Sequence, residues 1–246
     1  MRELKVAKYM MHWTLGRVVV FYAIFVLIIG LLFGVSFSIG EDVNSSGNEF
    51  SSIIFLFVVG LNSFKENFKM LQANNVSRKT FVRGLIIGVF PITFGMALVD
   101  LLINRICNIF AKCPTIFDMI YGSFRQSRAN WIQVNDIQTL FGTTFWNFAL
   151  YSIVFILGIL VSLCYYRSNK TLKVIISIVP AIILGFVINV SQKPIGSSNI
   201  SIGKFFASAF GLQNQNPYMA VLSFAVLGTL FSMSIYLLTR KAVLKD

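Results

Sequence analysis

The stretch VVVFYAIFVLIIGLLFGVSFSIG, residues 18–40, decides the fold, because it runs for 23 residues without a charged side chain. A helix rises about 1.5 Å per residue, so roughly 20 apolar residues cross the hydrocarbon core of a bilayer. The whole chain shares this character: of its 246 residues, 56% are hydrophobic and only 12% are charged, about half of the charged share usual in soluble domains. The sequence therefore predicts an all-α polytopic membrane protein and excludes a water-soluble domain.

Working outward from this stretch, five further charge-poor segments bring the predicted number of transmembrane helices to six. They are residues 50–64, 84–104, 137–166, 174–192 and 217–239. The first of these five is short for a span and must extend at one end, and only Asp100 interrupts the second. We therefore expect a single transmembrane domain over residues 1–246.

The basic residues divide unequally between the two sides of the predicted bundle. The chain has 21 Lys and Arg against 9 Asp and Glu, a net charge of +12. Of these 21 basic residues, 15 fall on the side that holds both termini and residues 65–83, and six fall on the other side with five of the acids. Basic residues near span ends mark the cytoplasmic side, so both termini are expected there. The apolar majority argues against a nucleic-acid partner and favours the lipid bilayer.

Residues 1–17 differ from the spans because they are amphipathic. Lys5, Lys8 and His12 share one arc of a helical wheel, while Trp13 and the Met residues lie on the apolar remainder. This pattern predicts an interfacial helix, with its basic arc toward lipid headgroups and its Trp and Met residues in the acyl boundary. The alternative is a short basic anchor that only sets the topology. In either case His12 is expected to be a polar residue at headgroup level.

The connection between the second and third spans, KENFKMLQANNVSRKTFVR at residues 65–83, is the main cytoplasmic segment. Phe68 and Leu71 recur at helical spacing, Asn74 and Asn75 are expected to break that helix, and Ser77 is suited to cap the next one. This predicts a helix-turn-helix that offers a docking surface, although an ordinary basic loop has the same composition. The residues assigned to this surface are Lys65, Phe68, Lys69, Leu71, Asn74, Asn75, Ser77, Arg78 and Lys79.

The phrase NNVSRKTFVRG at residues 74–84, between the second and third of six spans and behind a basic amphipathic N-terminus, resembles the permease subunits of ABC-2-type exporters. Peptide exporters of Gram-positive bacteria, such as the phenol-soluble-modulin exporter, have this size and layout. The resemblance implies that residues 65–83 couple to a separate ATPase subunit, which holds the ATP and Mg. It also implies a second permease subunit, as homodimer or heterodimer, and location in the bacterial cytoplasmic membrane.

The segment at residues 191–216, between the last two spans, has a second point of resemblance. Residues 202–212 are apolar except for Lys204, over about half of the length needed to span. This predicts a re-entrant or interfacial segment, which ABC-2 permeases also place here on the outer side. The alternative is a surface loop that happens to be apolar.

Residues 107–136 depart from the family pattern, because a short loop is expected between the third and fourth spans. This 30-residue external segment is rich in aromatic side chains and is therefore expected to be ordered. It would serve as a lid over the exit, as a partner-binding element or as a helix on the outer leaflet. Cys107 and Cys113 lie on this side and are expected to be buried free thiols, although an oxidant could pair them.

Catalytic and metal-binding residues are missing from the sequence. No G-x-x-x-x-G-K-[ST] loop is present, so if ATP drives this protein, another chain must bind it. The single His and three Cys are too few for a zinc or haem site, and one intramembrane acid is too few for an aspartyl protease. We therefore expect a non-catalytic subunit that binds no cofactor itself.

Four polar residues inside the predicted spans are candidates for a translocation pathway: Asn62, Asp100, Asn147 and Asn189. A carboxyl group in a span is costly unless it is paired or wet. Asp100 is therefore expected either to line a pathway or to act structurally, by reaching the surface or pairing with Arg105. The Asn residues and the many Phe suit an amphipathic or hydrophobic cargo, with a peptide favoured.

Two G-x-x-x-G pairs, Gly30 with Gly34 and Gly84 with Gly88, predict close helix contacts. No internal repeat is found, which argues against a secondary carrier. The sequence thus predicts the permease subunit of an ATP-driven exporter. The alternative is an ATP-independent membrane protein, either a carrier or a peptide-immunity protein.

Overall fold

A computed structural model describes residues 2–39, 46–122, 124, 131–169, 171–174, 205 and 207–240. The described part of the chain is helical and contains no strand. The helices are α1 (Arg2–Ile39), α2 (Glu49–Asn62), α3 (Lys65–Ala73), α4 (Arg78–Phe110), α5 (Ile116–Ile120), α6 (Ile137–Arg167) and α9 (Pro217–Arg240). The predicted fifth span at residues 174–192, with Asn189, lies outside the described residues except for residue 174.

Four of these helices, α1, α4, α6 and α9, are long and apolar enough to cross a membrane. The prediction of an α-helical protein with the composition of a membrane protein is therefore confirmed. The second predicted span is less simple. Helix α2 has 14 residues, about 21 Å of rise, and a break at Ser63 and Phe64 separates it from α3.

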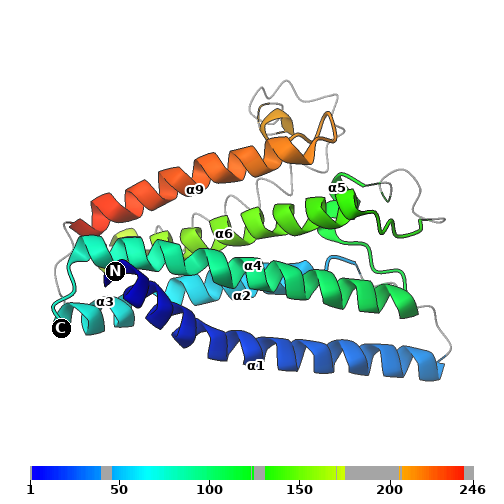
Figure 1. The fold of residues 1–246 in the computed structure, drawn as a ribbon, viewed down its shortest axis with the longest axis horizontal. Coiled ribbons are helices and arrows are strands. Elements are labelled where there is room, and N and C mark those ends of the chain that lie inside the picture. The colour runs from blue at the N-terminus through cyan, green and yellow to red at the C-terminus, as the bar shows by residue number, and fades with distance from the viewer. Residues whose placement is uncertain are drawn as a thin grey trace.

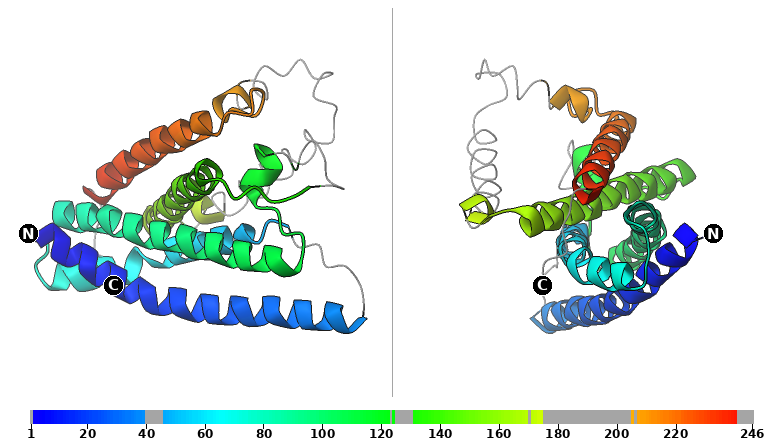
Figure 2. Two further views of the ribbon diagram at one scale, coloured as in Figure 1. Left: turned by 45° about the vertical axis from the view of Figure 1, so that its right-hand side comes forward. Right: turned by 90° about the vertical axis from the view of Figure 1, so that its left-hand side faces the viewer.

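The helices form an elongated bundle with two distinct ends (Figure 1). The N-terminus, α3 and the last turn of α9 lie at one end, called here the α3 end, and α5 lies at the opposite end, called the α5 end. Helix α6 is central, because α2, α4 and α9 all pack against it, while α1 packs on α4. Figure 2 shows α1 and α9 on opposite sides of the layer that contains α4 and α6.

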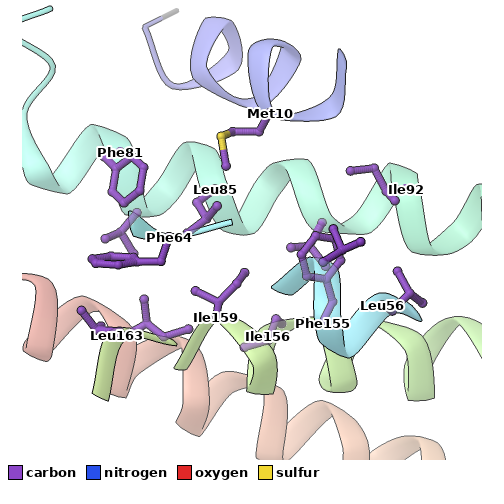
Figure 3. Packing of buried hydrophobic residues seen from close by; sticks show 14 of the residues in the cluster. Met10, Leu56, Phe64, Phe81, Leu85, Ile92, Phe155, Ile156, Ile159 and Leu163 are labelled. Atoms are coloured by element: carbon purple, nitrogen blue, oxygen red, sulfur yellow. The ribbon is translucent and has the colours of Figure 1, made fainter. Parts of the chain in front are cut away.

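The core lies between α2, α4 and α6, and a cluster of aromatic rings lies at its α3 end. Phe64, Phe68 and Phe81 are fully buried there and their rings contact one another. The rings of Phe64 and Phe68 also contact the ring of Tyr166. Figure 3 shows side chains from α1, α4 and α6 meeting in this cluster. Because lipid is as apolar as these side chains, the stabilisation comes from close packing between helices.

Helix α1 is continuous over residues 2–39, so residues 1–17 form no separate element within the described chain. Its first turns lie against α4, where Val6, Ala7 and Met10 are buried. The expectation that the Met residues face lipid is wrong for Met10, which enters the protein core (Figure 3).

Lys5, Lys8 and His12 are exposed, as their polarity requires. Trp13 is half-buried, and the guanidinium of Arg17 lies 3.4 Å from the centre of its ring.

Within the residues that the structure describes, one of the two G-x-x-x-G pairs makes a helix contact and the other makes none. A Cβ atom on Gly84 would lie 2.6 Å from Cβ of Val6, and one on Gly88 would lie 3.3 Å from the carbonyl oxygen of Ala7. These two glycines therefore let α1 approach α4. Gly30 and Gly34 have no atom of the described chain within 4 Å of such a Cβ.

A second close helix approach uses two glycines that no G-x-x-x-G motif contains. A Cβ on Gly60 would lie 2.5 Å from the carbonyl oxygen of Phe155, and a Cβ on Gly158 would lie 2.5 Å from that of Phe57. Helices α2 and α6 thus touch backbone to backbone. Each helix contributes a single glycine, so no spacing in the sequence marks the pair.

Candidate functional site

The segment from α3 to the start of α4 has the helix-turn-helix structure that the sequence predicts. Helix α3 ends at Ala73, and Asn75 adopts a left-handed conformation with φ of 55°. The side chain of Asn74 donates to the carbonyl of Met70 at 2.9 Å. Ser77 Oγ accepts a hydrogen bond from the amide of Thr80 at 3.2 Å and so caps α4. The break at Asn74 and Asn75 and the Ser77 cap are both confirmed.

Asn75, which adopts the left-handed conformation, allows a direct test of this turn. Glycine tolerates a positive φ without steric cost, whereas a β-branched residue does not. We expect Asn75→Val to lower the free energy of unfolding by about 1–2 kcal/mol and Asn75→Gly to leave it unchanged or raise it. Thermal unfolding in detergent measures both, and equal effects of Val and Gly would contradict the turn geometry.

Two of the predicted docking residues are buried instead of exposed. Phe68 has no exposed surface and Leu71 is 7% exposed, because both face the core between α4 and α6. The assignment of these two side chains to a contact surface is therefore wrong. Their helical spacing reflects the apolar face that holds α3 to the bundle.

The remaining residues of the segment form a basic surface at the α3 end of the bundle, called here the basic surface. Lys65, Lys79, Asn74, Asn75 and Ser77 are exposed, and Lys69 and Arg78 are half-buried. Within the described chain, the three lysines make no hydrogen bond or ion pair. The positive charge of this surface is therefore available to a partner.

Two arginines of this end hold the last turn of α9, a contact that the sequence analysis missed. Arg78 donates to the carbonyl of Arg240 at 2.9 Å, and Arg167 donates to that of Leu238 at 3.3 Å. The last carbonyls of a helix lack partners within it and carry partial negative charge, so cations stabilise them. Arg78 therefore has a structural role that links α4 to α9. Arg83 likewise pairs with Glu3 of α1 at 2.9 Å.

Asp100 lies at the centre of a buried polar cluster in the bundle. The hydroxyl of Tyr22 on α1 donates to its Oδ1 at 2.8 Å, and the hydroxyl of Tyr151 on α6 donates to its Oδ2. Asp100 is 5% exposed and forms no ion pair with Arg105. Both structural expectations, snorkelling and pairing with Arg105, are therefore wrong, because two phenolic donors satisfy the carboxyl group away from water.

The other pathway candidates do not gather around one cavity. Asn147 is buried on α6, one turn from Tyr151, and its side-chain amide has no hydrogen-bond partner within the described residues. Asn62 is exposed at the α3 end, where it lines a cavity of about 840 Å³ between α1 and α2 together with Arg17 and Glu66. Asn189 lies outside the described residues. Asn147 is thus linked to Asp100 only through its position one turn from Tyr151, which donates to Asp100, whereas Asn62 lines a separate cavity.

The described part of the 107–136 segment packs on the bundle at the α5 end. Helix α4 continues to Phe110, and α5 begins with a capping box between Thr115 and Asp118. Ile116 and Phe117 are buried against Trp146 of α6 and Ala220 of α9. Cys107 and Cys113 are both buried and form no disulfide within the described chain, as predicted.

The described part of the predicted re-entrant segment, residues 205 and 207–216, lies against the same cluster. Its Phe210 ring contacts the ring of Phe224 on α9, and its carbonyl accepts from the hydroxyl of Tyr121 at 2.7 Å. Residues 191–204 lie outside the described chain. The described parts of these two segments therefore meet at the α5 end.

The described residues thus form an α-helical structure with four membrane-length helices, a basic surface at one end and two packed connecting segments at the other. No protein-family model, curated protein or solved structure matches the chain. No group of three His, Cys, Asp or Glu side chains in the described residues is placed to hold a metal ion.

Proposed function

We propose that this chain is the permease subunit of an ATP-driven exporter of the ABC-2 type. In this proposal it has six spans with both termini in the cytoplasm, and it pairs with a second permease and a separate ATPase in the bacterial cytoplasmic membrane. The observation that carries the proposal is the basic surface on a helix-turn-helix fixed to the core. The resemblance of residues 74–84 to the coupling segment of such permeases supports the same reading.

The basic surface is suited to receive an acidic groove on a partner. The charges of Lys65, Lys69 and Lys79 are not used within the described chain, and exposed complementary charges speed encounter and fix orientation. Met70 is 39% exposed between these charges and adds an adaptable apolar contact. A surface that combines exposed cations with one flexible apolar side chain is suited to bind another protein.

The structure beneath this surface offers a route for force into the bundle. Phe64 and Phe68 contact Phe81 of α4 and Tyr166 of α6 through their rings. Close-packed interiors transmit displacement because they have few voids to absorb it. A push on α3 would therefore move α4 and α6 together.

The mechanism follows from these parts. Closure of the ATPase subunits on ATP would press on α3, tilt α4 and α6, and change a cavity between two permeases from inward to outward access. The cargo would be amphipathic or hydrophobic, with a peptide favoured. ATP and Mg would stay on the partner, and this chain would supply the pathway.

The first test is co-purification with charge reversal on the basic surface. We expect the native protein, purified in mild detergent, to bring down an ABC ATPase subunit, and Lys69→Glu/Lys79→Glu to reduce its recovery at least about tenfold, because two attractive contacts become repulsive. Arg78 is left intact, since its reversal would also disturb α9. Lys5→Glu/Lys8→Glu provides a matched control with the same change of charge at the same end.

The outcomes separate the proposal from its alternative. Retention of the ATPase in the control and its loss in the test variant support docking on the basic surface. Purification of the native chain alone, with its helical content intact, would contradict the exporter and favour an ATP-independent carrier or peptide-immunity protein. Equal losses in the test and control variants would contradict docking at this surface.

A further inference from the structure

Two of the three cysteines of the chain lie side by side at the α5 end. Cys107 lies in the last turn of α4, and Cys113 lies in the short segment that leads into α5. Their thiol groups share a hydrogen bond, so the two sulfur atoms are neighbours. Both side chains are buried, with exposed fractions of 3% and 0%. The third cysteine, Cys164, lies near the opposite end of the bundle, in the last turn of α6.

The chain turns back at the surface between these two cysteines. Helix α4 ends at Phe110, and Ala111 adopts an extended conformation with φ of −153° and ψ of 164°. Ile109 is 76% exposed and Phe110 is 75% exposed, so the link itself lies at the surface while the cysteines on either side of it are buried. Links of this kind open locally without unfolding of the whole structure. The thiols therefore flank a turn whose opening admits a small reagent.

Two side-chain amides of α4 hold Cys113 in place. The backbone amide of Cys113 donates to Oδ1 of Asn108 at 2.9 Å, and its carbonyl accepts from Nδ2 of Asn108 and Nδ2 of Asn104, each at 2.8 Å. Cys107 and Asn108 follow Asn104 by three and four positions, so the three residues lie toward one side of the helix. These hydrogen bonds therefore hold the backbone of Cys113 against the side of α4 that carries Cys107.

This arrangement favours one disulfide over two independent thiols. When a reagent converts one thiol into a mixed disulfide, the other thiol already lies beside the sulfur that it must attack. A reaction between groups held in place proceeds at an effective concentration far above that of an external thiol. Two cysteines that only fill space need no fixed contact between their sulfur atoms, because a free cysteine packs as a small apolar side chain.

We propose that Cys107 and Cys113 are a redox-sensitive pair, in which a low-molecular-weight disulfide creates a bond that fixes α5 to the end of α4. The thiolate of one cysteine attacks the reagent and releases its first thiol, and the thiolate of the other cysteine attacks the mixed disulfide and releases the second. The protein loses two protons and two electrons, and the reagent becomes two molecules of its thiol. The proposal stands whether or not the chain is an exporter.

The segment that follows Cys113 is held to its neighbours by contacts that such a bond would strengthen. Glu49 of α2 accepts a hydrogen bond from the amide of Ile116 at 3.3 Å, and the hydroxyl of Tyr121 donates to the carbonyl of Phe210 at 2.7 Å. Each hydrogen bond contributes little net stability, so α5 is expected to separate locally from the bundle. A disulfide close to its first turn limits that motion, because it shortens the free link to α4.

The first experiment treats the full-length protein in mild detergent with one equivalent of dipyridyl disulfide. We expect intact-mass spectrometry to show the loss of two hydrogen atoms, with this product at least about tenfold more abundant than the mixed disulfide. After denaturation, one alkylatable thiol should remain, that of Cys164, and peptide mapping should place the bond between Cys107 and Cys113. Cys164→Ala is expected to form the same bond. Cys107→Ser is expected to stop at a mixed disulfide, and if it fails to fold, the wild-type masses decide.

Hydrogen exchange reports the effect of the bond on α5. The amides of Met119 and Tyr121 donate to the carbonyls of Thr115 and Phe117, at 3.0 Å and 2.8 Å. We expect the disulfide to slow the exchange of these two amides several-fold, and dithiothreitol to restore the original rates. The amides of α9 are the internal control and should keep their rates. Cys107→Ser after the same treatment should show no slowing in α5.

Either of two results would overturn the proposal. Failure of the folded wild type to form the bond, whether its thiols stay reduced or stop at mixed disulfides, would show that the two cysteines are not a redox pair. Formation of the bond with unchanged exchange at Met119 and Tyr121 would show that it does not fix α5.

Discussion

Gly158→Ala is expected to lower the free energy of unfolding by about 2–3 kcal/mol, and Gly158→Leu by more, because neither side chain fits between α6 and α2. The atom that a Cβ at this position meets is the backbone carbonyl oxygen of Phe57 at 2.5 Å, and Cα of Gly60 lies at 3.0 Å. Backbone atoms cannot rotate aside as a flexible side chain can. The two helices must therefore separate. Unfolding by a denaturing detergent, followed by circular dichroism, measures the change.

Matched glycines serve as controls for this prediction. Gly95 on α4 and Gly30 on α1 have no atom of the described chain within 4 Å of a Cβ placed on them. Alanine favours a helix over glycine by about 1 kcal/mol, so Gly95→Ala and Gly30→Ala should leave stability unchanged or slightly higher. If Gly158→Ala were as stable as Gly95→Ala, the close contact between α2 and α6 would be absent in the protein.

The second large effect is expected at Asp100. Replacing it with leucine leaves the buried hydroxyls of Tyr22 and Tyr151 without their acceptor, so we expect Asp100→Leu to lower the free energy of unfolding by about 3–5 kcal/mol. Asp100→Asn keeps one acceptor oxygen in the same place and should cost about 1–2 kcal/mol. Thermal unfolding of the purified variants in detergent gives the comparison.

A double-mutant cycle shows whether this cost comes from the tyrosine contact. Tyr151→Phe removes one donor, so it should destabilise the wild type more than it destabilises Asp100→Leu, in which that hydroxyl is already unpaired. Additive effects would contradict the cluster. The cycle also separates structure from transport, because a residue that acts only in the pathway would affect transport without changing stability.

The sequence alone determined where most helices run and where several of them begin. Charge-poor runs of about 20 residues or more predicted α4, α6 and α9, because only helices satisfy their own backbone hydrogen bonds in lipid. Local side-chain chemistry predicted the break at Asn75 and the cap at Ser77, since each depends on atoms within a few residues. These features needed no knowledge of distant contacts.

Only the tertiary structure decided which apolar residues face protein. Phe68, Leu71 and Met10 were assigned to surfaces or to lipid, and all three are buried in the bundle. Arg78, assigned to docking, also holds the end of α9. Asp100 bonds to tyrosines that are 78 and 51 residues away, a pairing that no local pattern contains.

The physical reason is the nature of the solvent. Hydropathy separates residues that prefer water from residues that do not, and on that basis the spans were recognised. Lipid tails and a protein interior are equally apolar, so the hydropathy of a side chain does not show whether it faces lipid or the protein core. Which glycine pair makes a contact, and which phenylalanine packs in the core, depends on the shapes of helices far apart in the chain.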